Sequence, residues 1–371
     1  MNRPAAQRLP RAARLREGLK RLGLVVGSVV FSLVVLELGL RALDGWQGLT
    51  HWPNLVLQAR TASWDRHTVH DDRLGFVPKP DYFWDHGMAH YDAHSNRVTP
   101  APTDTTGGGA VLAEPPVLVL GDSFAHGDEI TDEEAWPARL QPLIHRRVIN
   151  AAMSGYGIDQ MVLRGEIEAA REKPAAIVLS FIADDVRRME MKRVWGAEKP
   201  YFTLADGKLV EHNVPVPPAP DPATTLDVWH TLLGRSVLFE TVLTSLGWWY
   251  EWTADHVRVM PSGAGLTLVC PLFQRLARIG VPVLVVGEYA PYHWQNERFA
   301  RETRQTMRSV LACADAAGFA TLDLFDTIDA GVRKQGLWTI FRVAHPAPTG
   351  TALAAQAIAA ELGKRRLLPG P

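Results

Sequence analysis

The sequence has few cysteines and no large excess of either charge. Only Cys270 and Cys313 occur among 371 residues, and we expect two buried, unpaired thiols, although export would permit a disulfide between them. The formal net charge is −1, so no global field favours binding to nucleic acid. Internal repeats are also absent from the sequence. The length suffices for one large domain or two small ones.

The one long apolar run lies near the N-terminus. Seven cations and one acid occur in residues 1–21, and Leu22 to Leu36 then carries no charge. Leu22 to Leu43 reaches the ~20 residues of a membrane-spanning helix if Glu37 and Arg41, four residues apart, neutralise each other near the far interface. The alternatives are a buried core helix, which does not explain the cations, and a cleaved signal peptide, for which no clear cleavage site follows.

The charge pattern therefore predicts a topology. Residues 1–21 form a basic cytoplasmic tail and residues 22–43 an uncleaved inner-membrane anchor, because cations flank the cytoplasmic end of a span. The main domain is then extracytoplasmic, in the periplasm.

Regular alternation of strands and helices begins only at residue 116. Residues 44–115 are a mixed extension and linker that ends in a flexible loop, Thr105 to Ala110. The predicted strands are Pro116–Leu120, Arg147–Ala151, Ala175–Ile182, Val281–Glu288 and Ala320–Phe325. Their alternation with helices predicts an α/β fold with a doubly wound five-stranded parallel sheet. Residues 116–186 and 264–371 are its two halves. The proline-rich segment 187–263 is an insertion, partly helical from Leu226 to Trp252, that packs over the core.

Four segments that carry reactive side chains fall at strand ends or helix starts. They are Gly121-Asp122-Ser123-Phe124, Asn150 to Gly157, Ala183-Asp184-Asp185 and Ala344-His345-Pro346. Because the carboxyl ends of parallel strands share one edge of the sheet, we expect the four to converge. A nucleophilic serine needs a base and donors for the oxyanion. Ser123, His345 and the backbone N–H groups of Ser123 and Gly155 provide such a set.

The arrangement resembles the SGNH (GDSL-type) hydrolases from about Asp72 to Leu367. GDSF, SGYGIDQ and the His345-Pro346 pair are similar to three of the blocks of that family. The resemblance implies that Ser123 is the nucleophile, Gly155 an oxyanion donor and His345 the base. A membrane-tethered branch of the family is suggested by the N-terminal anchor and three further segments, Leu74-Gly75-Phe76, Ser95-Asn96-Arg97 and Lys199-Pro-Tyr-Phe202.

Two positions depart from the family pattern. Asp184 stands where the family has an asparagine that donates to the oxyanion, and an ionised carboxylate only accepts hydrogen bonds. Arg342 stands where the family has an aspartate three residues before the histidine. A cation there is expected to lower the proton affinity of His345, and an Arg342–Asp184 ion pair is a hypothesis that links both departures. Asp185 or Glu288 is the alternative acid. His126 is expected on the rim of the loop.

These features predict a serine hydrolase that cleaves an acyl ester, and an acetyl group on a surface glycan is one candidate substrate. The related activity of O-acyl transfer is equally compatible with these features. The alternative is a catalytically impaired SGNH-fold binding or scaffold protein that acts with proteins of envelope polysaccharide modification. We expect no cofactor and no metal. His86, His90 and His94 recur at four-residue intervals, but Gly87 argues against the helix that would align them as ligands.

Overall fold

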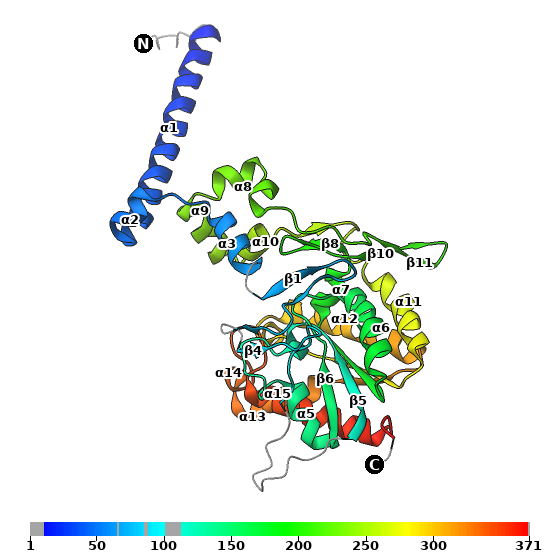
Figure 1. Cartoon of the computed structure of the whole chain (residues 1–371). Helices are drawn as coiled ribbons and strands as arrows, with labels where there is room; N and C mark the ends of the chain where they lie inside the picture. The colour runs from blue at the N-terminus through cyan, green and yellow to red at the C-terminus, as the bar shows by residue number, and fades with distance from the viewer. Residues whose placement is uncertain (1–10, 65–66, 85–87, 101–112, 370–371) are drawn as a thin grey trace, which may run out of the picture. The chain divides into compact units, whose positions relative to one another are not determined.

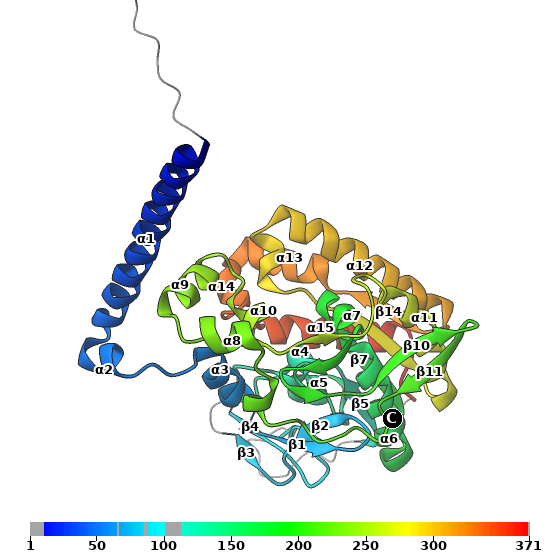
Figure 2. The same ribbon diagram turned by 90° about the horizontal axis from the view of Figure 1, so that it is seen from above.

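The computed structural model describes residues 11–64, 67–84, 88–100 and 113–369 (Figure 1, Figure 2). The chain divides into two compact units, residues 1–62 with 221–254 and residues 63–220 with 255–371. The expected loop at Thr105 to Ala110 and the His86 position lie outside the described residues.

The larger unit is built on a five-stranded parallel sheet, as predicted. Its strands lie in the order β14-β13-β7-β5-β6, and every neighbouring pair is parallel. The sheet order reverses between β5 and β7, which is where α/β sheets form a ligand crevice at the carboxyl ends of the strands. The strands are β5 (Ala113–Leu120), β6 (Arg146–Asn150), β7 (Ala176–Phe181), β13 (Val283–Gly287) and β14 (Ala320–Asp323).

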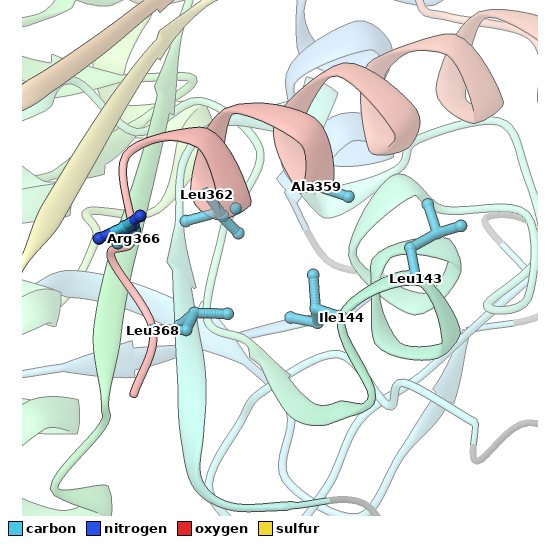
Figure 3. A pocket seen from close by; sticks show the side chains of 7 residues that line it. Leu143, Ile144, Ala359, Leu362, Arg366 and Leu368 are labelled. Carbon is cyan, nitrogen blue, oxygen red and sulfur yellow. The ribbon is translucent and has the colours of Figure 1, made fainter. Parts of the chain in front are cut away.

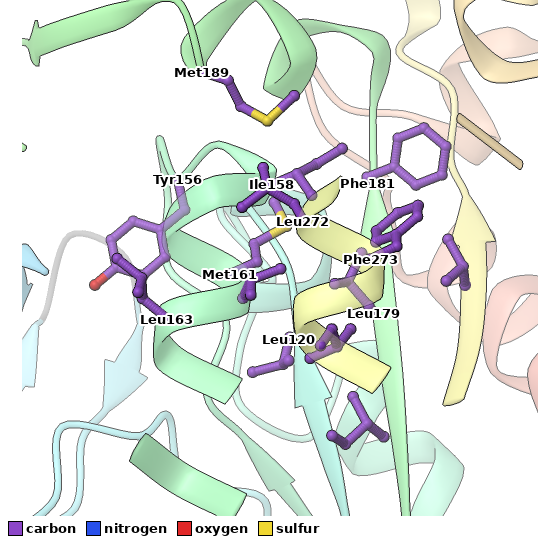
Figure 4. Close-up of a cluster of buried hydrophobic side chains, with 14 of the residues drawn as sticks. Leu120, Tyr156, Ile158, Met161, Leu163, Leu179, Phe181, Met189, Leu272 and Phe273 are labelled. Carbon is purple, nitrogen blue, oxygen red and sulfur yellow. The ribbon is translucent and has the colours of Figure 1, made fainter. Parts of the chain in front are cut away.

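Helices cover both faces of this sheet. Alternate residues of each strand point to opposite faces, so Leu118 and Leu120 join one buried cluster while Val117 and Val119 join the other. The first cluster (Figure 4) includes α6 (Ile158–Glu172), α11 (Leu266–Leu276) and α12 (Glu297–Ala316). The second includes α4 (Ser123–His126), α5 (Trp136–Ile144), α13 (Phe325–Gln335), α14 (Leu337–Ile340) and α15 (Pro348–Lys364). Two 3-10 turns, η2 (Ala277–Ile279) and η3 (Pro291–Trp294), complete this layer structure.

A disulfide joins the two cysteines. Cys270 on α11 and Cys313 on α12 are bonded, with a Cα–Cα distance of 4.7 Å. The expectation of unpaired thiols is therefore wrong. The two helices pack against each other on one face of the sheet, and this contact brings together side chains that are 43 residues apart in the sequence.

Short antiparallel strands that the sequence analysis did not predict surround the sheet. α7 (Ala183–Arg188) leads into a three-stranded sheet of order β12-β8-β9 and a β10–β11 hairpin. Lys199 fixes this region to α6, because its fully buried Nζ lies 2.5 Å from Asp159 Oδ2. These strands are β8 (Met191–Val194), β9 (Ala197–Glu198), β10 (Tyr201–Ala205), β11 (Lys208–His212) and β12 (Val257–Arg258). Two hairpins precede the main sheet, β1 (Thr68–Asp71) with β2 (Gly75–Pro78) and β3 (Phe83–Trp84) with β4 (Ala89–His90).

The smaller unit is helical and contains the predicted span. α1 (Arg11–Leu43) holds one stretch, Arg16–Leu43, that is long and apolar enough to cross a membrane, and an 18-residue window within it has a mean hydropathy of 2.3. The helical part of the insertion belongs to this unit and not to the unit of the sheet. The other helices are α2 (Gly45–Thr50), α3 (Leu55–Trp64), η1 (Pro222–Thr225), α8 (Val228–Leu233), α9 (Val237–Ser245) and α10 (Trp249–Thr253).

Candidate active site

Ser123 lies at the turn between β5 and α4. Gly121 packs so closely that a Cβ there would lie 2.6 Å from Ala125 Cβ, so the turn requires glycine. Asp122 caps the helix by accepting a hydrogen bond of 2.9 Å from the Phe124 N–H. Ser123 is the first helical residue, and its own N–H therefore has no acceptor within the helix. This turn places a nearly buried hydroxyl and an available amide at the switch point of the sheet.

His345 reaches the Ser123 hydroxyl from the segment before α15. Its Nε2 lies 2.9 Å from Ser123 Oγ. The His345 loop is closed by a bridge between Phe341 and Pro346 and by a 2.8 Å hydrogen bond from the Arg342 N–H to the His345 carbonyl. The edge of the imidazole packs against the ring of Phe124. The structure thus brings together the serine and the histidine that the sequence analysis singled out.

A third residue, Glu129, contacts the other ring nitrogen of His345, and the sequence analysis did not single it out. Glu129 Oε1 lies 3.0 Å from His345 Nδ1, so serine, imidazole and carboxylate stand in the order of a catalytic triad. The backbone of Glu129 has φ of 68°, a left-handed conformation that is costly for a residue with a Cβ and that is concentrated at functional sites. The candidate acid therefore comes from the loop that follows the nucleophile.

Neither expected alternative acid contacts His345. Asp185 accepts hydrogen bonds from the Ile182 N–H at 2.9 Å and from Arg188 Nη1 at 2.5 Å. Glu288 accepts from Trp136 Nε1 at 3.2 Å and from the Ser180 hydroxyl, and burial raises its pKa to about 7. The prediction that Asp185 or Glu288 is the acid is therefore wrong. Asp185 is held by residues of α7 and its N-cap. Glu288 is held by side chains of α5 and β7.

The two departures from the family pattern are not joined by an ion pair. Asp184 binds Arg187 Nε at 2.6 Å and Arg188 Nη2 at 3.2 Å, whereas the Arg342 side chain is exposed. The Arg342–Asp184 hypothesis is therefore wrong. Burial opposes ionisation of Asp184, but Arg188 and Arg187 lower its pKa below the ordinary value. The charge of the Asp184 carboxylate is thus balanced by two arginines. A carboxylate only accepts hydrogen bonds, so Asp184 cannot donate one to an oxyanion.

The electrostatic surroundings of His345 favour its protonated form. Burial alone would lower its pKa, but the hydrogen bond to Glu129 and the charges of Asp128, Glu129 and Asp122 raise it overall above 6.5. The expectation of a lowered proton affinity at His345 is therefore not met, because the net shift of its pKa is upward. A base in this setting accepts a proton readily, and the carboxylates stabilise the imidazolium that forms.

A second hydrogen-bond network lies beside the row Ser123, His345 and Glu129. Asp128 Oδ1 accepts from the Ser154 hydroxyl at 2.7 Å and lies 2.6 Å from His126 Nδ1. Tyr91 Oη lies 3.1 Å from His126 Nε2. His126 is completely buried, so its expected place on the loop rim is wrong. Burial opposes ionisation of Asp128, yet His126 and Ser154 lower its pKa. The network joins the loop of Glu129 to the turn that holds Gly155.

Gly155 is fixed by its backbone conformation and by an aromatic ring. It has φ of +80°, and a Cβ at this position would overlap Trp195 Cζ3. The indole thus rests directly on the glycine. The turn has this close contact only because the residue has no side chain.

Substitution of Gly155 by alanine is expected to be costly. The left-handed φ alone costs roughly 1–2 kcal/mol for a residue with a Cβ, and the overlap with Trp195 adds displacement of the turn. We expect a lower melting temperature and a lower kcat/KM. The double variant Gly155→Ala/Trp195→Ala removes the overlap with the indole, so we expect part of the lost melting temperature and kcat/KM to return. The strain of the left-handed backbone remains. Unchanged melting and activity in the single variant contradict this packing.

The pocket in Figure 3 is separate from this site. It lies between the end of α5 and the end of α15 and is lined mainly by Leu143, Ile144, Ala359, Leu362 and Leu368. Leu143 and Ile144 immediately precede β6, so this pocket lies at the amino ends of the strands. Ser123 and the residues around it follow the carboxyl ends.

Solved structures, two of them of esterases, are similar to this chain at low sequence identity. TesA has 17% identity and a TM-score of 0.40, covering 67% of this chain and 98% of its own. The esterase EstA from Pseudoalteromonas sp. has 12% identity and a TM-score of 0.39, covering 68% and 99%. A single-residue variant of Axe2, an acetyl xylan esterase from Geobacillus stearothermophilus, has 14% identity and a TM-score of 0.41, covering 71% and 99%. No protein-family model and no curated protein matches the chain.

Proposed function

We propose that this chain is a serine esterase in which Ser123, His345 and Glu129 carry the chemistry. The observation that carries the proposal is the continuous row of contacts, 2.9 Å from Ser123 Oγ to His345 Nε2 and 3.0 Å from His345 Nδ1 to Glu129 Oε1. Each group has a distinct task in acyl transfer: nucleophile, general base and orienting carboxylate.

The proposed reaction has two steps. Ser123 Oγ attacks the ester carbonyl carbon as its proton moves to His345 Nε2, and the amides of Ser123 and Gly155 hold the oxyanion. The bond from the carbonyl carbon to the alcohol oxygen breaks, and that oxygen takes the proton from Nε2. Water then attacks the acyl-enzyme, gives its proton to Nε2 and releases the acid, while the proton returns to Ser123. A sugar hydroxyl in place of water gives O-acyl transfer.

The proposed substrate is an acyl ester of a carbohydrate at the cell surface, such as an O-acetylated glycan. This part of the proposal follows from the proposed topology, with an inner-membrane anchor at residues 22–43 and a periplasmic main domain. Glu37 and Arg41 support an uncleaved anchor. Both are buried and bonded to residues 235–238 of the same unit, so removal of this segment as a signal peptide would leave those partners without their contacts.

A fluorophosphonate probe tests the reactivity of Ser123. We expect the full-length protein in detergent to become labelled, with Ser123→Ala as the unlabelled control and Ser309→Ala, at an exposed serine of α12, as a serine control that retains labelling. Absence of labelling in a protein with a normal melting temperature overturns the esterase proposal. That result favours the alternative of an impaired binding or scaffold protein, which Asp184 in place of the family asparagine motivates.

The activity is expected to fall on acidification at a higher pH than an isolated histidine would cause. His345 must be neutral to accept the Ser123 proton, and its pKa is raised above 6.5. Therefore kcat/KM for a chromogenic acetyl ester rises with pH through a midpoint above 6.5. A midpoint below that value contradicts the proposed environment of His345.

A further inference from the structure

The C-terminal end of α1 has a buried ion pair within an otherwise exposed apolar helix. Among the described side chains of α1, only those of Glu37 and Arg41 are buried, at 8% and 2% exposure. Glu37 Oε1 lies 2.7 Å from Arg41 Nε. A helix in water buries its apolar side chains and exposes its charges, so the reverse pattern fits hydrocarbon surroundings.

This ion pair holds α9 against α1. The Glu37 carboxylate accepts hydrogen bonds from the Ser236 hydroxyl at 2.7 Å, the Val237 N–H at 3.0 Å and the Leu238 N–H at 2.8 Å. Arg41 donates to the Arg235 carbonyl. Two first-turn amides of α9, those of Val237 and Leu238, are therefore satisfied by a carboxylate of α1. If α1 spans a membrane, the start of α9 lies at the depth of Glu37.

An apolar groove of about 670 Å³ lies between these helices. This volume is within the roughly 300–1,000 Å³ of small-molecule sites. One wall consists of Val30, Leu33, Val34, Leu36 and Leu38 of α1, and the other includes Leu232, Leu238, Phe239 and Val242. Val30 precedes Leu38 by eight residues, so the α1 wall extends about 12 Å along the helix axis.

The polar residues of the groove are gathered at one end. Arg235, Ser236 and Glu37 line it there, whereas Val30 and Val34 lie farther along α1. Arg235 is exposed and its Nη1 donates to the Trp52 carbonyl at 2.7 Å. A long apolar trough that ends at an exposed cation is complementary to an anionic amphiphile.

Exposed aromatic residues lie on or next to other helices of the same unit, α2, α8 and α10. Trp46, Trp229, Trp248 and Tyr250 are each at least 50% exposed. Such residues are enriched where a membrane protein meets the headgroup region. They agree with a position of α8, α9 and α10 in the bilayer interface.

We propose that the groove between α1 and α9 binds the acyl chain of a phospholipid, with its phosphate near Arg235. The proposal rests on the proposed membrane anchor. The region 228–252 then forms an interfacial element that is docked on the anchor and that holds a lipid at a fixed place beside it.

Photo-crosslinking tests this proposal on the full-length protein. The protein is placed in nanodiscs of phosphatidylethanolamine and phosphatidylglycerol with a phosphatidylglycerol that carries a diazirine in its acyl chain. We expect crosslinks to peptides that contain Leu238, Phe239 and Val242. The double variant Val34→Trp/Val242→Trp fills the groove and loses these crosslinks. The double variant Phe31→Trp/Val35→Trp changes exposed positions of α1 that do not line the groove, and it retains them.

The outcomes separate the groove from the anchor. Crosslinks to α1 around Phe31 and Val35 without crosslinks to α9 overturn the groove and leave the anchor intact. Crosslinks to neither helix overturn the anchor as well. Fluorophosphonate labelling of Ser123, which belongs to the other unit, reports whether the larger unit of the groove variants is intact, and the melting temperature of the full-length variants reports on the whole chain.

Discussion

Replacement of Glu129 by glutamine is expected to lower kcat/KM by about 10²–10⁴-fold. The upper limit is the loss that follows when the orienting aspartate of a serine protease becomes asparagine and the histidine is held in the wrong tautomer. The lower limit allows for a weaker interaction between Glu129 and His345, since the Glu129 side chain is 34% exposed and water screens its charge. Steady-state hydrolysis of a chromogenic acetyl ester measures this effect.

The glutamine variant also has a signature that a merely structural residue lacks. Glu129 raises the pKa of His345, so Glu129→Gln moves the acidic limb of the kcat/KM profile to lower pH. Glu133→Gln is the matched control, because Glu133 is an exposed acid a few residues along the chain. If Glu129→Gln and Glu133→Gln have equal activity and equal pH profiles, Glu129 does not act on His345.

The sheet and the Ser123–His345 pair were predictable because they depend on local patterns. Buried strands are recognisable as β-branched and leucine runs, and parallel topology brings their carboxyl ends to one edge. Glu129 could not be found in this way. It lies 216 residues before its histidine, and its orientation depends on a left-handed backbone in an irregular loop. Its only signal was an acidic segment that follows the nucleophile directly.

The helical unit was predictable in part. The apolar run and its cationic flank indicated a span, but the partner of the Glu37–Arg41 pair lies about 200 residues farther along the chain. Hydropathy detects the exposed apolar surface of α1 and carries no information about which later segment caps its charges. The same lack of long-range information explains why the Cys270–Cys313 disulfide was not expected.

Replacement of Arg97 by methionine is expected to lower the stability of the larger unit by about 3–5 kcal/mol, because it removes the buried cation from the buried Asp132 carboxylate and leaves only the contacts of that carboxylate with His90. The Arg97 side chain is completely buried, and its Nε donates to Asp132 Oδ1 at 2.7 Å. Its guanidinium also donates to the carbonyls of His126 at 2.9 Å, Gly127 at 2.5 Å and Ile130 at 2.7 Å. A drop in the melting temperature measures the loss.

The same substitution is expected to reduce activity in the protein that remains folded. Arg97 holds the carbonyls on both sides of Asp128 and Glu129, so its fork of donors fixes the loop that carries the candidate acid. Arg97→Lys keeps the charge but cannot reach all four acceptors, and its kcat/KM at a temperature well below melting should lie between wild type and Arg97→Met. Arg301→Met removes an exposed cation of α12 and is expected to change neither quantity. Should Arg97→Met melt earlier and yet retain full kcat/KM, the arginine stabilises the fold without positioning Glu129, and the loop must be held by the Asp128 network alone.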